Sequence, residues 1–165
     1  MTAIIILGVD PGLNKCGWGL VVSEGSRLSY VAHGVIKPPQ QQQLASRLHD
    51  LYEALSEIIE KYQPHEAAVE ETFVNSNARA ALALGQARGV AMAAAARCGL
   101  LVAEYAPTTI KKAVVGSGAA DKTQIAFMVQ RLLPTAGAVT ADAADALGVA
   151  LCHAAHGGFK RRASA

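Results

Sequence analysis

Runs of apolar residues alternate with polar breaks along the chain, and the first third predicts three strands. Residues 3–9 are rich in β-branched side chains and free of charge, which is typical of a strand buried on both faces. Two more strand patterns follow at residues 17–24 and 27–37, with Gly25-Ser26 between them as a hairpin turn. The chain is therefore expected to begin with a three-stranded meander.

The rest of the chain alternates helical and extended patterns. Leucine and isoleucine recur at steps of three and four over residues 44–62, which predicts an amphipathic helix. Short apolar runs at 65–71 and 99–106 predict two more strands, on either side of an alanine-rich helix at 78–97. This order predicts an α/β fold with a five-stranded mixed sheet and helices on both faces. Further helices are expected at residues 107–115, 122–133 and 140–156.

The composition favours one globular domain. The chain has 165 residues, of which 52% are hydrophobic and 17% are charged, enough for a substantial core. We expect a single domain over residues 1–157, followed by a flexible basic tail at 158–165. The formal net charge is only +2, so a surface that binds nucleic acid must concentrate its positive charge on one face.

The cysteines and the lengths of the apolar runs indicate where in the cell the protein is located. Cys16, Cys98 and Cys152 are an odd number without metal-binding spacing, and we interpret them as free thiols of a cytosolic protein. The apolar N-terminus is short and lacks the basic start of a signal peptide. No apolar run approaches the ~20 residues of a membrane span, so we expect a cytoplasmic protein without membrane contact.

Four acids are expected to gather at one edge of the sheet. Asp10 ends the first strand and Glu70 ends the fourth, and the carboxyl ends of these strands meet if the strands are parallel neighbours. Asp142 and Asp145 are three residues apart on the last helix, so they share a face. Each acid also has an ordinary interpretation, as a turn residue, a solvated strand end or an acid beside the helix dipole.

Such a cluster predicts a metal site. Neighbouring carboxylates repel one another and raise each other's pKa values, so a cation should offset their charge. Oxygen ligands select a hard ion, Mg²⁺ or Mn²⁺, and we interpret the five histidines as structural or surface residues. Four carboxylates suit two ions roughly 4 Å apart, the arrangement that hydrolyses phosphodiester bonds.

Glycines surround the first acid. Pro11-Gly12 turns the chain away from Asp10 and leaves its carboxylate open. Gly17 and Gly19 lie on the returning strand, and we interpret them as leaving room for a sugar–phosphate backbone.

Three other side chains are candidates for DNA contacts. Phe73 lies in a polar loop, where an aromatic ring could stack on an unpaired base or fold back into the core. Lys111 and Lys122 flank a glycine-containing loop and could neutralise phosphates, although solvated surface lysines are the ordinary interpretation.

Several motifs, in this order and at this spacing, resemble the RuvC Holliday junction resolvases. They are GVDPG with GWG, VEETF, LGQARGVA, KKAVVGSGAADK and ADAADAL, and the resemblance covers roughly residues 4–155. It implies a ribonuclease-H-like fold, a homodimer, and Mg²⁺-dependent nicking of two opposed strands of a four-way junction in recombination and DNA repair. It also implies a branch-migration motor complex of the RuvA and RuvB type as a partner.

The resemblance assigns roles to individual residues. Glu70, rather than Glu71, matches the family acid because Phe73 follows it by three residues. Phe73 matches an aromatic residue that contacts bases at the junction centre, and Lys111 and Lys122 match basic positions that contact DNA or lie near the scissile phosphate. The catalytic and metal-binding acids that it implies are Asp10, Glu70, Asp142 and Asp145.

Three other functions stay open. An actin-like or sugar-kinase-like ATPase also has Asp-x-Gly loops, but such proteins are typically far longer and need a second phosphate loop, which we do not find. A nuclease of the same fold could cut another substrate, such as an RNA–DNA hybrid. A junction-binding protein without catalysis is the third, and EDTA would distinguish it because chelation should abolish cutting and leave binding intact.

Overall fold

Five strands form one mixed sheet, as the sequence predicts. The computed structural model begins with an antiparallel meander of β1 (Ile4–Asp10), β2 (Cys16–Glu24) and β3 (Arg27–Ile36). On the other side of β1, β4 (Glu66–Glu70) and then β5 (Leu101–Tyr105) pair in parallel. The strand order is β3-β2-β1-β4-β5, so the expected parallel pairing of the first and fourth strands is confirmed.

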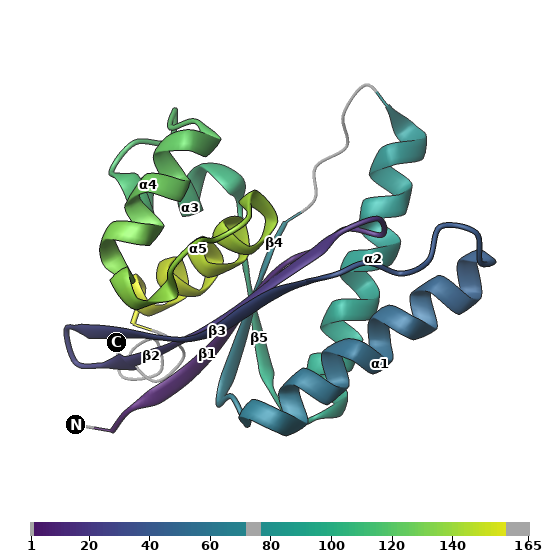
Figure 1. Cartoon of the computed structure of the whole chain (residues 1–165), viewed down its shortest axis with the longest axis horizontal. Coiled ribbons are helices and arrows are strands. Elements are labelled where there is room, and N and C mark those ends of the chain that lie inside the picture. Colours follow the sequence, from purple (N-terminus) through teal and green to yellow (C-terminus); the bar gives the residue numbers. More distant parts are fainter. Residues whose placement is uncertain (1, 72–76, 158–165) are drawn as a thin grey trace.

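Helices cover both faces of this sheet (Figure 1). One face packs against α1 and α2, and the other packs against α3, α4 and α5. The α/β class and the two-sided arrangement are therefore confirmed. The helices are α1 (Leu44–Tyr62), α2 (Ala78–Arg97), α3 (Pro107–Val115), α4 (Lys122–Leu132) and α5 (Ala141–Ala155), with a 3₁₀ turn at Pro134–Ala136.

Each face of β1 faces a separate apolar core. Ile6 belongs to the core under α5, whereas Leu7 and Val9 belong to the core under α1 and α2. This alternation follows from the two-residue period of a strand, and it explains why the strand is apolar throughout. The central position of β1 fixes Asp10, its last residue, at the edge of a rigid sheet.

Local signals set the starts of the helices that carry the candidate residues. The Asn77 side chain accepts a hydrogen bond from the Ala80 amide and begins α2. Asp121 and Gln124 form a reciprocal capping box at the start of α4, at 2.8 Å in both directions. Thr140 caps α5, as the sequence predicts.

Three glycines of the first hairpin, Gly8, Gly17 and Gly19, form the surface against which α5 packs, here called the glycine seat. This corrects the interpretation that Gly17 and Gly19 leave room for a sugar–phosphate backbone. A Cβ atom on Gly17 would collide with the carbonyl oxygen of Asp142, and one on Gly19 would lie 2.6 Å from the Leu147 side chain. A Cβ on Gly8 would collide with α5 as well. These positions are therefore occupied by the protein's own helix, so they do not leave room for a DNA backbone.

The structure describes residues 2–71 and 77–157. The tail expected at 158–165 and the candidate Phe73 lie outside these ranges. Within them, no helix is long and apolar enough to cross a membrane, and all three cysteines are free thiols.

Candidate active site

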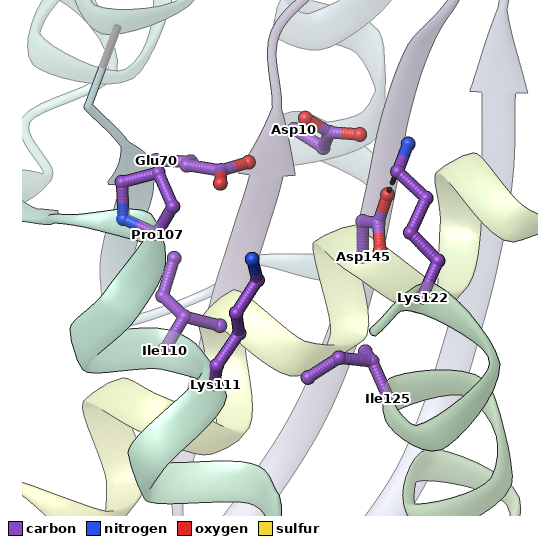
Figure 2. Close-up of a pocket in the computed structure, with 8 residues that line it drawn as sticks. All are labelled: Asp10, Glu70, Pro107, Ile110, Lys111, Lys122, Ile125 and Asp145. Atoms are coloured by element: carbon purple, nitrogen blue, oxygen red, sulfur yellow. Dashed lines mark ion pairs between the residues drawn. The ribbon is translucent and has the colours of Figure 1, made fainter. Parts of the chain in front are cut away.

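Three of the four predicted acids line one cavity at the carboxyl ends of β1 and β4. Asp10 and Glu70 are the last residues of these parallel neighbours, whose pairing runs up to Val9 opposite Val69. Asp145 reaches the same cavity, of about 200 Å³, from α5. Figure 2 shows the three carboxylates around this space, with Lys111 and Lys122 reaching toward it from α3 and α4.

A side-chain hydrogen bond joins the two strand-end acids, and the pKa of each is raised. Burial raises the pKa of Asp10 to about 8, and the charges of Glu70 and Asp145 add to this rise. Burial also raises the pKa of Glu70. The hydrogen bond between the two side chains favours the protonated form of Asp10 and the charged form of Glu70. The protonation of one carboxyl therefore depends on that of the other.

The two lysines offset part of the negative charge. Burial raises the pKa of Asp145, and Lys122 is the first of the groups that lower it again. The Lys122 Nζ atom lies 3.7 Å from the Asp145 Oδ2 atom, while its side chain remains 82% exposed. Lys111 acts in the same direction on Glu70 and on Asp145. Both lysines therefore lie beside the acids, and their contacts with DNA stay a prediction.

Asp142 lies on the other side of Asp10. It lines a neighbouring groove of about 650 Å³ that shares Asp10 with the cavity but not Glu70 or Asp145. Its charge nevertheless contributes to raising the pKa of both Asp10 and Asp145. The four acids are therefore electrostatically coupled, but only three of them line the same cavity.

Arg47, which the sequence analysis does not identify as a candidate, lines this groove and bonds to the loop beside it. Arg47 of α1 donates through its Nη2 atom to the Leu13 carbonyl at 3.2 Å and to the Asn14 Oδ1 atom at 2.8 Å. This contact joins the loop after Asp10 to α1. Cys16, which follows this loop as the first residue of β2, is fully buried, so its thiol is part of the core.

Three apolar residues complete the cavity, and the sequence offers only an indirect signal for them. Pro107, Ile110 and Ile125 form its wall beside the lysines. Ile110 immediately precedes Lys111, and Ile125 follows Lys122 by three residues on α4. The only sequence signal for these two isoleucines is therefore their position next to, or one helical turn from, a candidate lysine.

The donor chemistry of the cavity fits a hard divalent cation. All its acidic ligand atoms are carboxylate oxygens, which Mg²⁺ and Mn²⁺ prefer. Burial first, and then the charges of neighbouring carboxylates, raise the pKa values of Asp10, Glu70 and Asp145, and a bound cation would offset both effects. Among the described residues, however, no three Asp, Glu, His or Cys side chains are grouped so that they could already hold an ion. Asp10 and Glu70 bond to each other, and Asp145 pairs with Lys122.

Comparison with known proteins finds relatives that match most of the chain. A family model described as crossover junction endodeoxyribonuclease RuvC matches residues 6–153. The crossover junction endodeoxyribonuclease RuvC of Caulobacter vibrioides is 58% identical over 149 residues, covering 90% of this chain and 88% of that protein. The protein of the same name from Caulobacter strain K31 is 60% identical over 151 residues, covering 92% and 89%.

A solved structure matches the fold at similar coverage. T. thermophilus RuvC in complex with Holliday junction substrate superimposes with a TM-score of 0.86 at 30% identity, covering 93% of this chain and 94% of that one. The range matched by the family model includes every candidate acid and lysine described above.

Proposed function

The chain belongs to the RuvC family of crossover junction endodeoxyribonucleases, and we propose that it resolves Holliday junctions by paired nicks in two opposed strands, in recombination and DNA repair. The observation that carries this proposal is the cavity in which Asp10, Glu70 and Asp145 meet beside two lysines. Carboxylates and lysines together suit a phosphodiester, because one set binds cations and the other binds phosphate.

Asp10, Glu70, Asp142 and Asp145 are the residues that would hold the metal, which we propose to be a pair of Mg²⁺ ions, with Mn²⁺ as a substitute. When bound, the ions supply an activated water and a counter-charge for the leaving oxygen. Glu70 and Asp145 come from opposite sides of the cavity, a strand end and a helix, so both faces of the reacting phosphate are within reach of a carboxylate.

The remaining groups bind and orient the DNA strand. Lys122 is largely exposed and only loosely paired with Asp145, so a phosphate can replace the carboxylate as its partner. Lys111 approaches the cavity from α3 and holds the same phosphate from the other side. The apolar wall formed by Ile110 and Ile125 keeps water from one side of the cavity, which strengthens these charge interactions.

The proposal extends to the assembly. A junction has two-fold symmetry, so a homodimer would present two cavities to two opposed strands. We assign Phe73 to base contacts at the junction centre and a branch-migration complex of the RuvA and RuvB type to the partners. The location that suits chromosomal DNA is the bacterial cytoplasm. We assign residues 1–157 to the nuclease domain, and the basic tail at 158–165 lies outside the described residues.

The experiment is a nicking assay on an end-labelled immobile four-way junction, with a linear duplex of the same sequence as control. We expect paired, symmetric nicks on the junction alone, with Mg²⁺ and not with EDTA. Cutting of the duplex or of an RNA–DNA hybrid at an equal rate would assign the protein to another substrate. Tight junction binding without cutting, over a set of junctions that vary the core sequence, would overturn the catalytic proposal.

A further inference from the structure

A buried polar triad joins α5 and β4, which carry Asp145 and Glu70 of the cavity, to the neighbouring strand β5. The His153 Nε2 atom lies 2.7 Å from the Glu66 Oε2 atom, and its Nδ1 atom lies 2.8 Å from the Tyr105 hydroxyl. His153 is completely buried, and Glu66 and Tyr105 are 6% and 4% exposed. Neutral His153 satisfies both contacts at once, because Nε2–H donates to the carboxylate while Nδ1 accepts from the hydroxyl.

The three members come from three different elements. His153 is on α5, Glu66 is at the start of β4, and Tyr105 is the last residue of β5. Tyr105 lies directly opposite Glu70 in the sheet register, and its carbonyl accepts a 2.9 Å hydrogen bond from the Glu71 amide. Two residues after Tyr105, Pro107 begins α3, the helix that carries Lys111.

The distance between the triad and the cavity is nearly the same along α5 as along β4. From His153 back to Asp145 is eight residues of helix, about 12 Å at 1.5 Å per residue. From Glu66 to Glu70 is four residues of strand, about 13 Å at 3.3 Å per residue. Because the two lengths agree, the bond between His153 and Glu66 at one end brings Asp145 level with Glu70 at the other.

Apolar packing also holds α5 on the sheet, through Leu147, Val149 and Leu151 in the core and through its close approach to the glycines of β1 and β2. Such packing is not directional, so the position of α5 along the strands is defined more sharply where a hydrogen bond is added to it. A hydrogen bond is directional, and a buried donor or acceptor without its partner is costly, so the triad admits one position of the helix.

We propose that His153, Glu66 and Tyr105 are positioning residues that set the register of α5 on β4 and β5 and thereby hold Asp145 at the distance from Glu70 that metal binding and cleavage need. The catalytic part of this inference rests on the proposed function. The positioning part concerns the protein's own acids and is tested without DNA.

The test uses variants that keep the shape of the core. Tyr105→Phe removes only the hydroxyl, Glu66→Met removes the carboxylate, and Glu66→Gln keeps an oxygen that can accept from His153. Val149→Ala, in the same core but outside the triad, is the control for a general loss of stability. We would compare single-turnover nicking rates, junction Kd values, and the Mn²⁺ concentration at the midpoint of the Mn²⁺-induced rise in Tm.

We expect Tyr105→Phe and Glu66→Met to lower the nicking rate and raise the Mn²⁺ midpoint on the order of ten-fold, as the loss of a supporting hydrogen bond typically does. Junction Kd should stay near the wild-type value, Glu66→Gln should recover most of both losses, and Val149→Ala should lower Tm without either loss. The proposal is wrong if Val149→Ala impairs rate and midpoint as much as the triad variants do, or if Glu66→Gln is as impaired as Glu66→Met. If the wild type binds Mn²⁺ but cuts no junction, the proposed function fails, and the midpoints still decide the positioning role.

Discussion

Replacing Asp10 by asparagine should abolish nicking and at the same time stabilise the metal-free protein. The substitution keeps the shape of the side chain and removes a charge that the fold disfavours. Burial and the neighbouring acids raise the pKa of Asp10 from 3.8 to about 8, so near neutral pH folding requires this carboxyl to take up a proton.

The size of the gain follows from linkage. Holding a proton on this carboxyl costs about 1.4 kcal/mol for each pH unit above its ordinary pKa, which gives about 4 kcal/mol at pH 7 as an upper bound. Asp10 keeps some contact with solvent, and asparagine keeps only part of the hydrogen bond to Glu70. We therefore expect Asp10→Asn to stabilise the fold by about 2 kcal/mol, a rise in Tm of about 4–8 °C.

The assay is thermal unfolding in EDTA at pH 7 and at pH 4, with nicking measured separately in Mg²⁺. At pH 4 the unfolded chain also protonates Asp10 in part, so the gain should largely disappear there. Glu57→Gln, which removes an exposed acid on α1, is the matched control and should change the free energy of unfolding by less than about 0.5 kcal/mol. A lower Tm for Asp10→Asn at pH 7, or a gain that is equally large at pH 4, would refute the reasoning, and near-normal nicking would refute the metal role.

Three further predictions concern the same site. In EDTA, the free energy of unfolding of the wild-type protein should fall as pH rises from about 4 toward 8. The pKa of Asp10 is higher in the folded protein than in the unfolded chain, so its stabilising contribution is complete below pH 4 and is lost as pH rises toward 8. A free energy of unfolding that rises over this range would contradict the charge cluster. Gly17→Ala should destabilise the fold by about 1–3 kcal/mol because the new methyl group meets the Asp142 carbonyl, whereas Gly89→Ala, with open space around it on α2, should raise Tm. Lys111→Ala should weaken junction binding and reduce the slope of log Kd against log salt by about 1, and an unchanged slope would show that this lysine contacts no phosphate.

The sequence predicts the elements and most of the site because its signals there are local. Strand ends place Asp10 and Glu70, helical spacing places Asp145, and the lysines flank a recognisable loop. The features that the sequence does not predict depend on tertiary contacts between elements that are distant in the chain. The hairpin sequence alone does not reveal the close approach of α5 to Gly17. From the sequence, the lack of a side chain at Gly17 suggests room for DNA, whereas in the structure α5 takes up that space.

The same limit explains two other results. Asp142 and Asp145 share a helix face, yet the helix lies over Asp10 in such a way that each lines a different side of it. His153 is a single histidine in an apolar helix, and only the fold shows that Glu66, 87 residues earlier in the chain, is its partner. Pairings over such distances have no periodic signal in one sequence.

The glycine seat and the acidic cavity are two consequences of one packing arrangement. An acidic cluster costs stability, so it persists only where other contacts determine the backbone around it. Here α5 lies so close to β1 and β2 that Gly8, Gly17 and Gly19 can carry no Cβ, and that closeness brings Asp142 and Asp145 within electrostatic reach of Asp10. A larger residue at Gly17 would move the helix away, relieve the repulsion among the acids and separate the groups that the proposed chemistry requires. Gly17→Ala should therefore lower the nicking rate by a larger factor than a core variant such as Val149→Ala that lowers Tm equally, and equal rates at equal Tm would show that the seat serves packing only.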